Sequence, residues 1–168
     1  MEAIKDLFSA KATAAAAEIK ELIKQHGEKK IGEITLAQVY QGMRGMTGLV
    51  TETSLLDAQE GIRFRGYSIP ELQVKLPKAK GGDEPLPEGL FYLMMVGEIP
   101  TEEDVKEITS NWQRRSHVPS HVFDVIDAFP LRTHPMTMYV AAVMALQTES
   151  KFAQEYAKGM NKKDYWQY

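Results

Sequence analysis

The chain has 168 residues, 43% of them hydrophobic, a formal net charge of −3 and no cysteine. This composition is typical of a soluble globular domain, and it excludes disulfides, cysteine nucleophiles and thiolate metal sites. The acidic balance provides no basic field for nucleic acid, and no apolar run is long enough to cross a membrane. The first residues do not resemble a secretory signal or a transit peptide. We therefore expect neither nucleic acid nor a membrane as a partner.

The N-terminal part is predicted to form a long helix over residues 3–26. Its alanine run has high helix propensity, and Gly27 supplies a stop. Residues 29–35 alternate weakly between apolar and polar, which we interpret as a short strand. Residues 36–43 are predicted to form one or two helical turns.

A small antiparallel hairpin is predicted next, with strands at 49–56 and 62–67 and a turn at 57–61. We treat residues 29–69 as one segment, which contains this hairpin together with several glycines and arginines.

Residues 70–168 are predicted to be helical apart from short loops. The predicted helices cover residues 70–75, 87–96, 101–115, 119–129, 135–149 and 151–158. The helix at 87–96 and the stretch at 140–146 are apolar on nearly all sides, so we expect both to be buried in a core or at a subunit interface. Three aromatic residues among the last four indicate an element that packs on something beyond this chain. The fold class is mainly α.

Glycines and arginines alternate at short spacing between Gln41 and Ile69. Glycine permits a positive φ, and arginine binds anions with a planar fork of donors. From the residues alone two interpretations stay open, a turn with solvated charges or a phosphate site. Lys162 and Lys163 leave the same choice between solvated charge and phosphate contact.

The four histidines favour structural roles. His26 lies at a predicted helix C-terminus, and His134 lies where it would cap the helix at 135–149. His117 and His121 are four residues apart, but Pro119 between them disfavours a continuous helix. No carboxylate completes a metalloprotease motif, and nucleophile elbows, Walker loops and dinucleotide fingerprints are missing. We therefore predict no metal site and no catalytic residue.

Several motifs, taken together and in order, resemble mitochondrial-type citrate synthase from about residue 18 to the end. They are GMRGMTGL at 42–49, ETS at 52–54, EGIRFRGYSIPE at 60–71, LPKAKGG at 76–82, EPLPEGL at 84–90, IPTEE at 99–103, PSHV at 119–122, HPM at 134–136 and YW at 165–166.

The resemblance implies an almost wholly helical homodimer with a large and a small domain. Members of the family condense acetyl-CoA with oxaloacetate and water to citrate and CoA in the mitochondrial matrix, without a metal or redox cofactor. An aspartate, two histidines and oxaloacetate-binding arginines do the chemistry, and none of the four histidines of this chain matches the catalytic positions. Residues 1–168 are thus expected to be the N-terminal part of the large domain, with the small domain absent and no activity alone.

Two residues match family positions that bind CoA. Arg44 matches an arginine that contacts the CoA phosphates. Lys162 matches a position where relatives often have an arginine that reaches the CoA of the partner subunit; lysine keeps the charge but loses the bidentate fork. The resemblance makes Arg63 and Arg65 structural members of the hairpin. It also places the helices near 119–149 in the dimer interface.

Three interpretations stay open at this point. The chain is part of a citrate synthase that needs the missing C-terminal portion, either as a piece of a longer chain or as half of a split enzyme. Alternatively it is a non-catalytic scaffold or interaction subunit derived from citrate synthase. A third possibility is 2-methylcitrate synthase, which has the same fold and takes a larger acyl-CoA.

Overall fold

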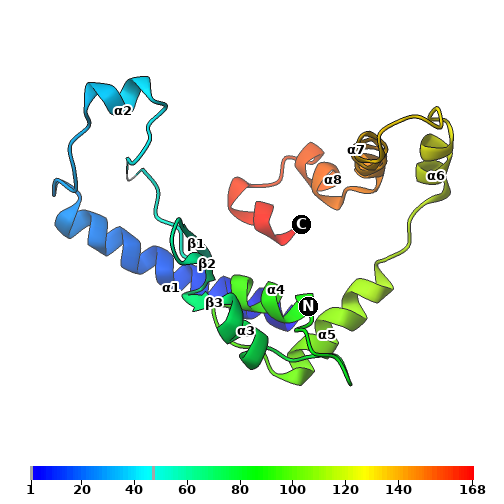
Figure 1. Ribbon diagram of the computed structural model, residues 1–168, viewed down its shortest axis with the longest axis horizontal. Helices are drawn as coiled ribbons and strands as arrows, with labels where there is room; N and C mark the ends of the chain where they lie inside the picture. The colour runs from blue at the N-terminus through cyan, green and yellow to red at the C-terminus, as the bar shows by residue number, and fades with distance from the viewer. Residues whose placement is uncertain (1, 47) are drawn as a thin grey trace. The chain divides into compact units, whose positions relative to one another are not determined.

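The computed structural model describes residues 2–46 and 48–168, and it divides into two compact units. Unit 1 spans Met1–Asn111 and unit 2 spans Trp112–Tyr168, and each is described by itself. The predicted mainly α class with one small hairpin is confirmed (Figure 1). Among the described helices, none combines the length and the apolar character that a bilayer span requires.

Unit 1 alternates helices with one small sheet. Its elements are α1 (Glu2–His26), α2 (Leu36–Tyr40), β1 (Ser54–Asp57), β2 (Gly61–Phe64), β3 (Tyr67–Ser68), α3 (Ile69–Lys75), α4 (Pro87–Val96) and α5 (Glu102–Arg114), whose last residues continue into unit 2.

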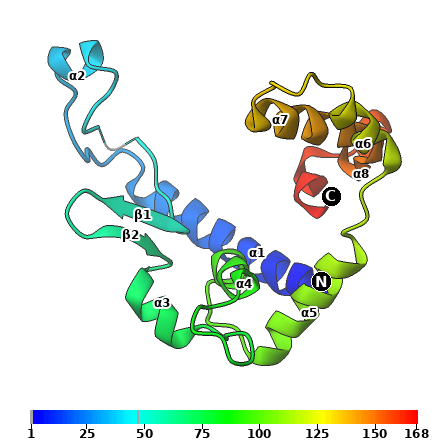
Figure 2. The same ribbon diagram turned by 45° about the vertical axis from the view of Figure 1, so that its right-hand side comes forward.

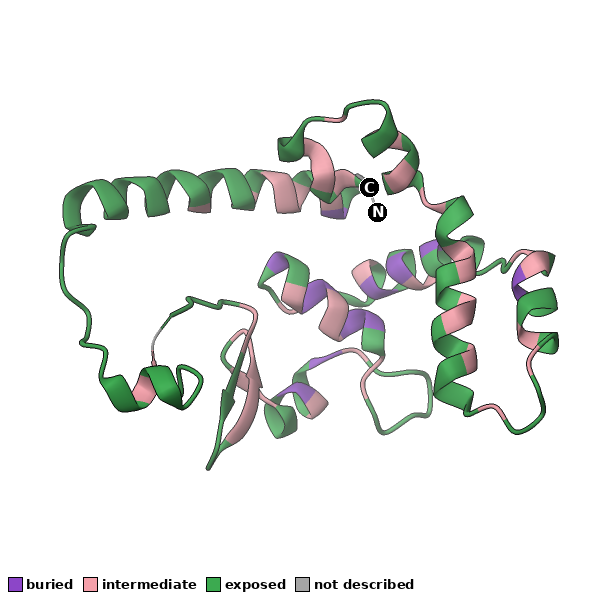
Figure 3. Ribbon diagram, turned by 90° about the horizontal axis from the view of Figure 1, so that it is seen from above, coloured by how far each residue is buried: buried purple, intermediate pink, exposed green. Residues whose placement is uncertain are grey.

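Helix α1 confirms the long N-terminal helix and ends where predicted, with the Gly27 amide donating to the carbonyl of Ile23 at 2.8 Å. Only its first turns pack on the rest of unit 1. Ile4 is buried there, and the ammonium of Lys11 donates to the carbonyl of Val96 at 3.1 Å. Residues 16–26 are exposed along the whole helix surface (Figure 3).

The sheet is antiparallel with strand order β1-β2-β3 (Figure 2). The predicted hairpin is confirmed, but its strands are shorter than predicted. β1 ends at Asp57 because its carboxylate accepts the amides of Gln59 and Glu60, at 2.7 and 2.9 Å, and starts the turn. The second predicted strand is split into β2 and β3 because Arg65 and Gly66 adopt positive φ of 48° and 87°.

The prediction of a strand at residues 29–35 is wrong. This segment is extended and exposed, and among the described residues no strand pairs with it. A weak alternation cannot make a strand without a neighbour that accepts its backbone hydrogen bonds. The short helix expected at 36–43 is present as α2, which ends at Tyr40.

Helices α3, α4 and α5 follow the predictions closely because their end signals are local. Ser68 and Glu71 form a capping box at the start of α3, and Thr101 is bonded to Asp104 in the same way at the start of α5. Pro87 opens α4, and Gly97 ends it with a φ of 85°.

Helix α4 is the centre of unit 1, which confirms the prediction that it is buried. One side packs with Ile4 of α1 and Ile108 of α5, through Tyr92 and Val96. The other side packs Leu93, which has no exposed surface, against the leucines of α3. Within unit 1 the buried residues therefore gather on α4 and the elements beside it (Figure 3).

Unit 2 contains α6 (Ser120–Asp127), α7 (Pro135–Ala145), a 3-10 turn η1 (Leu146–Glu149), α8 (Lys151–Ala157) and a second 3-10 helix η2 (Lys162–Gln167). α6 packs beside α7, and the imidazole Nε2 of His121 is hydrogen-bonded to the carbonyl of Ala145 at 3.1 Å. The predicted helix at 135–149 ends early as an α-helix because its last turn tightens to 3-10 geometry.

The expectation that the apolar stretch at 140–146 is buried in a core is wrong for this chain by itself. No residue of α7 is buried. Its exposed apolar residues are Met136, Tyr139, Val140, Val143 and Met144. The other expectation, that this helix lies at a subunit interface, stays a prediction.

The aromatic end of the chain does pack within unit 2. The rings of Phe152 and Tyr165 meet edge to face with centroids 5.3 Å apart, and Tyr156 lies against both. Trp166 and Tyr168 keep 43% and 56% of their surface exposed. The 3-10 helix η2 is therefore anchored on α8 by one ring, with two aromatic side chains left on its surface.

Candidate functional site

The candidate anion site is built on α2. Thr35 and Gln38 form a capping box, in which the Thr35 hydroxyl accepts the Gln38 amide at 3.3 Å and the Gln38 side chain accepts the Thr35 amide at 3.0 Å. This reciprocal pair fixes the start of a helix only five residues long. The short helix therefore fixes the point at which the following residues begin.

Beyond α2 the backbone cannot remain helical, because Gly42, Met43 and Gly45 have positive φ of 71°, 64° and 72°. The Met43 amide donates to the carbonyl of Gln38 at 2.8 Å, and the Met46 amide donates to the carbonyl of Met43 at 3.2 Å. We call residues 41–46 the Arg44 turn. The positive φ of Gly42 and Gly45 thus prevents α2 from continuing.

Arg44 stands exposed on this turn. Within residues 2–46 and 48–168, no hydrogen bond or ion pair holds its guanidinium. A hollow of about 240 Å³ lies beside the turn, lined by Ile31, Gly32, Glu33, Ile34, Gln38, Gly45 and Met46. Thr47, which belongs to the same motif, lies outside the described residues. A free guanidinium on a fixed turn is suited to binding an anion from solvent.

Lys162 is the first residue of η2 in unit 2 and is exposed. The Asn161 side chain caps this helix by accepting the Lys163 amide at 3.0 Å. Arg44 and Lys162 belong to different units, so the structure defines no distance between them. Their shared role in CoA binding stays a prediction.

Arg63 and Arg65 are structural members of the hairpin, as predicted. Arg63 donates to the Glu60 carboxylate at 3.0 and 3.2 Å and to the Gly66 carbonyl at 3.1 Å. Arg65 donates from Nε and one Nη to the carbonyl of Met94 at 3.2 and 2.7 Å. Both guanidinium groups are thus occupied, in contrast to that of Arg44.

The histidines keep the structural roles predicted for them where the structure tests this. The Nδ1 atom of His134 accepts the Met136 amide at 3.2 Å and caps α7. His121 joins α6 to α7, and His26 is exposed in the last turn of α1. Among the described residues, no group of three histidines or carboxylates could hold a metal ion.

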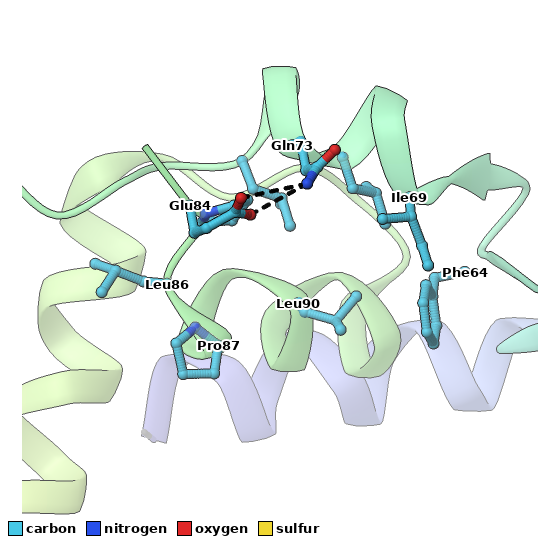
Figure 4. Close-up of a pocket in the computed structure, with 10 residues that line it drawn as sticks. Phe64, Ile69, Gln73, Glu84, Leu86, Pro87 and Leu90 are labelled. Carbon is cyan, nitrogen blue, oxygen red and sulfur yellow. Dashed lines mark hydrogen bonds between the residues drawn. The ribbon is translucent and has the colours of Figure 1, made fainter. Parts of the chain in front are cut away.

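Sequence reasoning missed one apolar pocket of about 180 Å³ between α3, α4 and the loop that joins them (Figure 4). Phe64, Leu72 and Leu90 line it, and Gln73 donates to the carboxylate of Glu84 at 3.2 Å. Three separate segments contribute the lining, so no single motif could have shown it. Most side chains that line it are apolar, and the carboxylate of Glu84 is bonded to Gln73, so the pocket is suited to packing and not to bond making.

A buried carboxylate was also missed. Glu88 lies in the first turn of α4 with 9% of its surface exposed, and its Oε1 accepts the Thr109 hydroxyl at 3.0 Å. No described residue is bonded to its Oε2. From sequence, a glutamate in the first turn of a helix suggests only a favourable contact with the helix dipole. The burial of Glu88 becomes visible only in the packing of α5 against α4.

Comparison with known proteins decides the family. Residues 42–168 match the family model described as "Citrate synthase, C-terminal domain". The chain belongs to the citrate synthase family. It is 53% identical, over 99% of its length, to the mitochondrial citrate synthase of Aspergillus niger. The mitochondrial citrate synthases of Kajikia audax and Xiphias gladius are each 51% identical over 98% of the chain. The chain spans 35% of the length of these curated relatives.

The names of these relatives agree with the citrate synthase interpretation, and none of the three is called a 2-methylcitrate synthase or a scaffold. All the motifs that suggested the family lie within the matched residues 42–168. The identity extends over the preceding residues as well, where the family model does not reach.

Proposed function

We propose that this chain is part of a citrate synthase that condenses acetyl-CoA with oxaloacetate and water to give citrate and CoA. The observation that carries the proposal is identity of 51–53% to three mitochondrial citrate synthases over nearly the whole chain. Their names support a mitochondrial location for this chain, and the matrix is the compartment we propose. The small domain and the C-terminal portion of the large domain are supplied by the rest of the enzyme.

Within that enzyme this segment binds CoA and makes no bond itself. No residue in the described part of the chain occupies the donor fork of the Arg44 guanidinium, which matches a phosphate group, and the exposed ammonium of Lys162 adds a second, less directional charge. Neither a metal nor a redox cofactor takes part, because a condensation of this kind needs only acid, base and charge stabilisation.

The proposed partner of unit 2 is a second copy of the enzyme. Helices α6 and α7 leave apolar side chains exposed, including Phe123, Tyr139 and Met144 at 53%, 63% and 67%. Those of α7 recur at helical spacing from Met136 to Met144, and an exposed apolar helix face of this kind is typical of a protein interface. This supports the proposal that the homodimer forms through the helices near 119–149.

The role of Arg44 is tested by Arg44→Ala in a full-length citrate synthase in which this sequence occupies its matching part. A hydrogen-bonded charge contact contributes about 1.5–3 kcal/mol, so we expect the KM for acetyl-CoA to rise about tenfold or more. The KM for oxaloacetate should hardly change, because Arg44 is assigned to the phosphates of CoA.

The matched control is Lys30→Ala, which removes another exposed cation of unit 1. It should leave both KM values unchanged. An unchanged KM for acetyl-CoA in Arg44→Ala would count against the proposed CoA contact.

A further inference from the structure

The Arg44 turn closes through one hydrogen bond, from the Met46 amide to the Met43 carbonyl at 3.2 Å. Arg44 and Gly45 are therefore the two central residues of a four-residue turn. Gly45 has a φ of 72°, whereas Arg44 is not among the residues with positive φ. Of the two central residues, only the second has a positive φ, which is the pattern of a type II turn and requires glycine or asparagine there.

We propose that Gly45 is a positioning residue for acetyl-CoA: by holding this turn in its type II form, it sets the side to which the Arg44 carbonyl and the Gly45 amide point where Arg44 meets the phosphates. The inference rests on the proposed CoA contact of Arg44. It extends that proposal from the cation itself to the peptide group beside it.

The reason is conformational and not steric. A Cβ added at Gly45 would meet no atom within 4 Å, so a substitution there causes no clash. An L side chain nevertheless disfavours a positive φ, and the turn can escape by flipping its central peptide to the type I form. In that flip the Arg44 carbonyl oxygen and the Gly45 N–H group each turn to the opposite face of the turn. The partial charges that an approaching anion meets are thereby changed.

The turn is held firmly enough for its geometry to matter. Met43, the first of the four residues closed by the hydrogen bond from Met46, donates its amide to the carbonyl of Gln38 in α2 at 2.8 Å, and Gln38 also forms half of the capping box with Thr35. The start of the turn is thus tied to the start of the helix. A flip of the peptide between Arg44 and Gly45 therefore takes place next to a residue whose position is fixed.

Gly48 offers a matched control three residues further along. It also has open space around its Cβ position, with no atom within 4 Å, but it does not have a positive φ. Gly48→Ala adds the same methyl group as Gly45→Ala without the conformational cost. Gly45→Asn is the conservative variant, because asparagine tolerates the left-handed region.

The experiment measures kcat and both KM values in the full-length citrate synthase described above. We expect Gly45→Ala to raise the KM for acetyl-CoA about fivefold or more, with kcat and the KM for oxaloacetate nearly unchanged. Gly45→Asn should recover most of the affinity, and Gly48→Ala should match the parent.

Arg44→Ala, measured in parallel, separates the two proposals. If it leaves the KM for acetyl-CoA unchanged, the CoA contact fails and the inference fails with it. If it raises that KM while Gly45→Ala does not, only the positioning role is overturned. A Gly45→Asn enzyme as impaired as Gly45→Ala, or a fall in kcat and melting temperature in both, would mean that the turn serves folding alone.

Discussion

At the scale of single residues, three nearby arginines differ in what occupies their guanidinium groups. Arg65 is held by a backbone carbonyl of α4 and Arg63 by a carboxylate of its own hairpin, whereas no described residue holds Arg44. The same residue type thus fastens the sheet to the core in one case and faces solvent in another. This difference in partners, and not the charge itself, separates structural from binding arginines.

The first prediction concerns Arg65, whose side chain is 21% exposed and bridges the hairpin to the end of α4. Arg65→Ala removes a charged donor from the carbonyl of Met94, so it should destabilise the last turn of α4 by about 1.5–3 kcal/mol. Arg63→Ala breaks an exposed ion pair with Glu60 and a bond to the Gly66 carbonyl, neither of which involves α4, so it should cost that turn about 1 kcal/mol or less. Hydrogen exchange of the α4 amides measures the loss of stability in each variant. Equal losses in the two variants would argue against a bridge from Arg65 to α4.

Much of the residue-level chemistry could be predicted from the sequence, but its geometry could not. Arg44 stood out as an arginine among glycines, and resemblance assigned it to a phosphate. The positive φ of Met43 and the turn that isolates Arg44 and Gly45 had no sequence signal beyond the glycines. The burial of Glu88 also escaped prediction, because it depends on the packing of a helix that follows later in the chain.

At the scale of elements, structure follows sequence where the signals are local. The ends of α3, α4 and α5 were predictable because proline, glycine and capping residues act within a single turn. The division of the second predicted strand at Arg65 and the 3-10 form of η2 were not. Both depend on contacts from elsewhere, the carbonyl of Met94 in the first case and the ring of Phe152 in the second.

The capping box of α3 yields a prediction about pH. The side-chain and backbone hydrogen bonds from Ser68, assisted by the charges of Arg63 and Lys75, hold the pKa of Glu71 below its usual value. A lowered pKa in the folded state stabilises the start of α3 above the usual carboxyl pKa, and this contribution is lost as the pH falls through the folded pKa.

Ser68→Ala should therefore raise the pKa of Glu71 toward its usual value, as followed by NMR titration of the carboxyl carbon. Asp57 is the internal control, because its pKa is lowered by hydrogen bonds from the amides of Glu60 and Gln59, which this substitution leaves in place. A pKa of Glu71 that does not move would show that the cap is not formed in solution.

The exposed face of α7 gives the next prediction. Met144 keeps 67% of its surface exposed, in the middle of the apolar stretch. Met144→Glu would bury an unpaired charge in the proposed dimer interface, so it should shift the full-length enzyme from dimer to monomer in sedimentation velocity. Gln154→Glu, at an exposed position of α8 outside the helices near 119–149, is the control and should remain dimeric. A Met144→Glu dimer of parental stability would remove α7 from the interface.

At the scale of the whole molecule, the balance between buried and exposed apolar surface indicates dependence on further protein. The described residues bury a small core around α4, while many more large apolar side chains remain exposed along α1, α2 and α7. Surfaces of this extent are covered in stable proteins by other parts of the chain or by partners. The relatives, of which this chain spans 35%, show how much additional polypeptide the family provides.

The chain alone is therefore expected to behave as an incompletely packed protein. It should bind a hydrophobic dye such as ANS and associate as its concentration rises, and its thermal unfolding should be broad. Supplying the remaining part of the relatives' polypeptide should suppress the dye binding. Sharp, cooperative unfolding of a monomer at low concentration would contradict this expectation.

The central claim is that this chain contributes CoA binding to a citrate synthase whose bond-making residues lie in the rest of the enzyme. The most direct measurement is the release of CoA thiol from acetyl-CoA and oxaloacetate, by the chain alone and after mixing with the remaining part of the Aspergillus niger citrate synthase. We predict no release by either part alone and oxaloacetate-dependent release by the mixture. Release by the chain alone, or a stable but inactive complex of the two parts, would contradict the claim, and the second outcome would favour a scaffold.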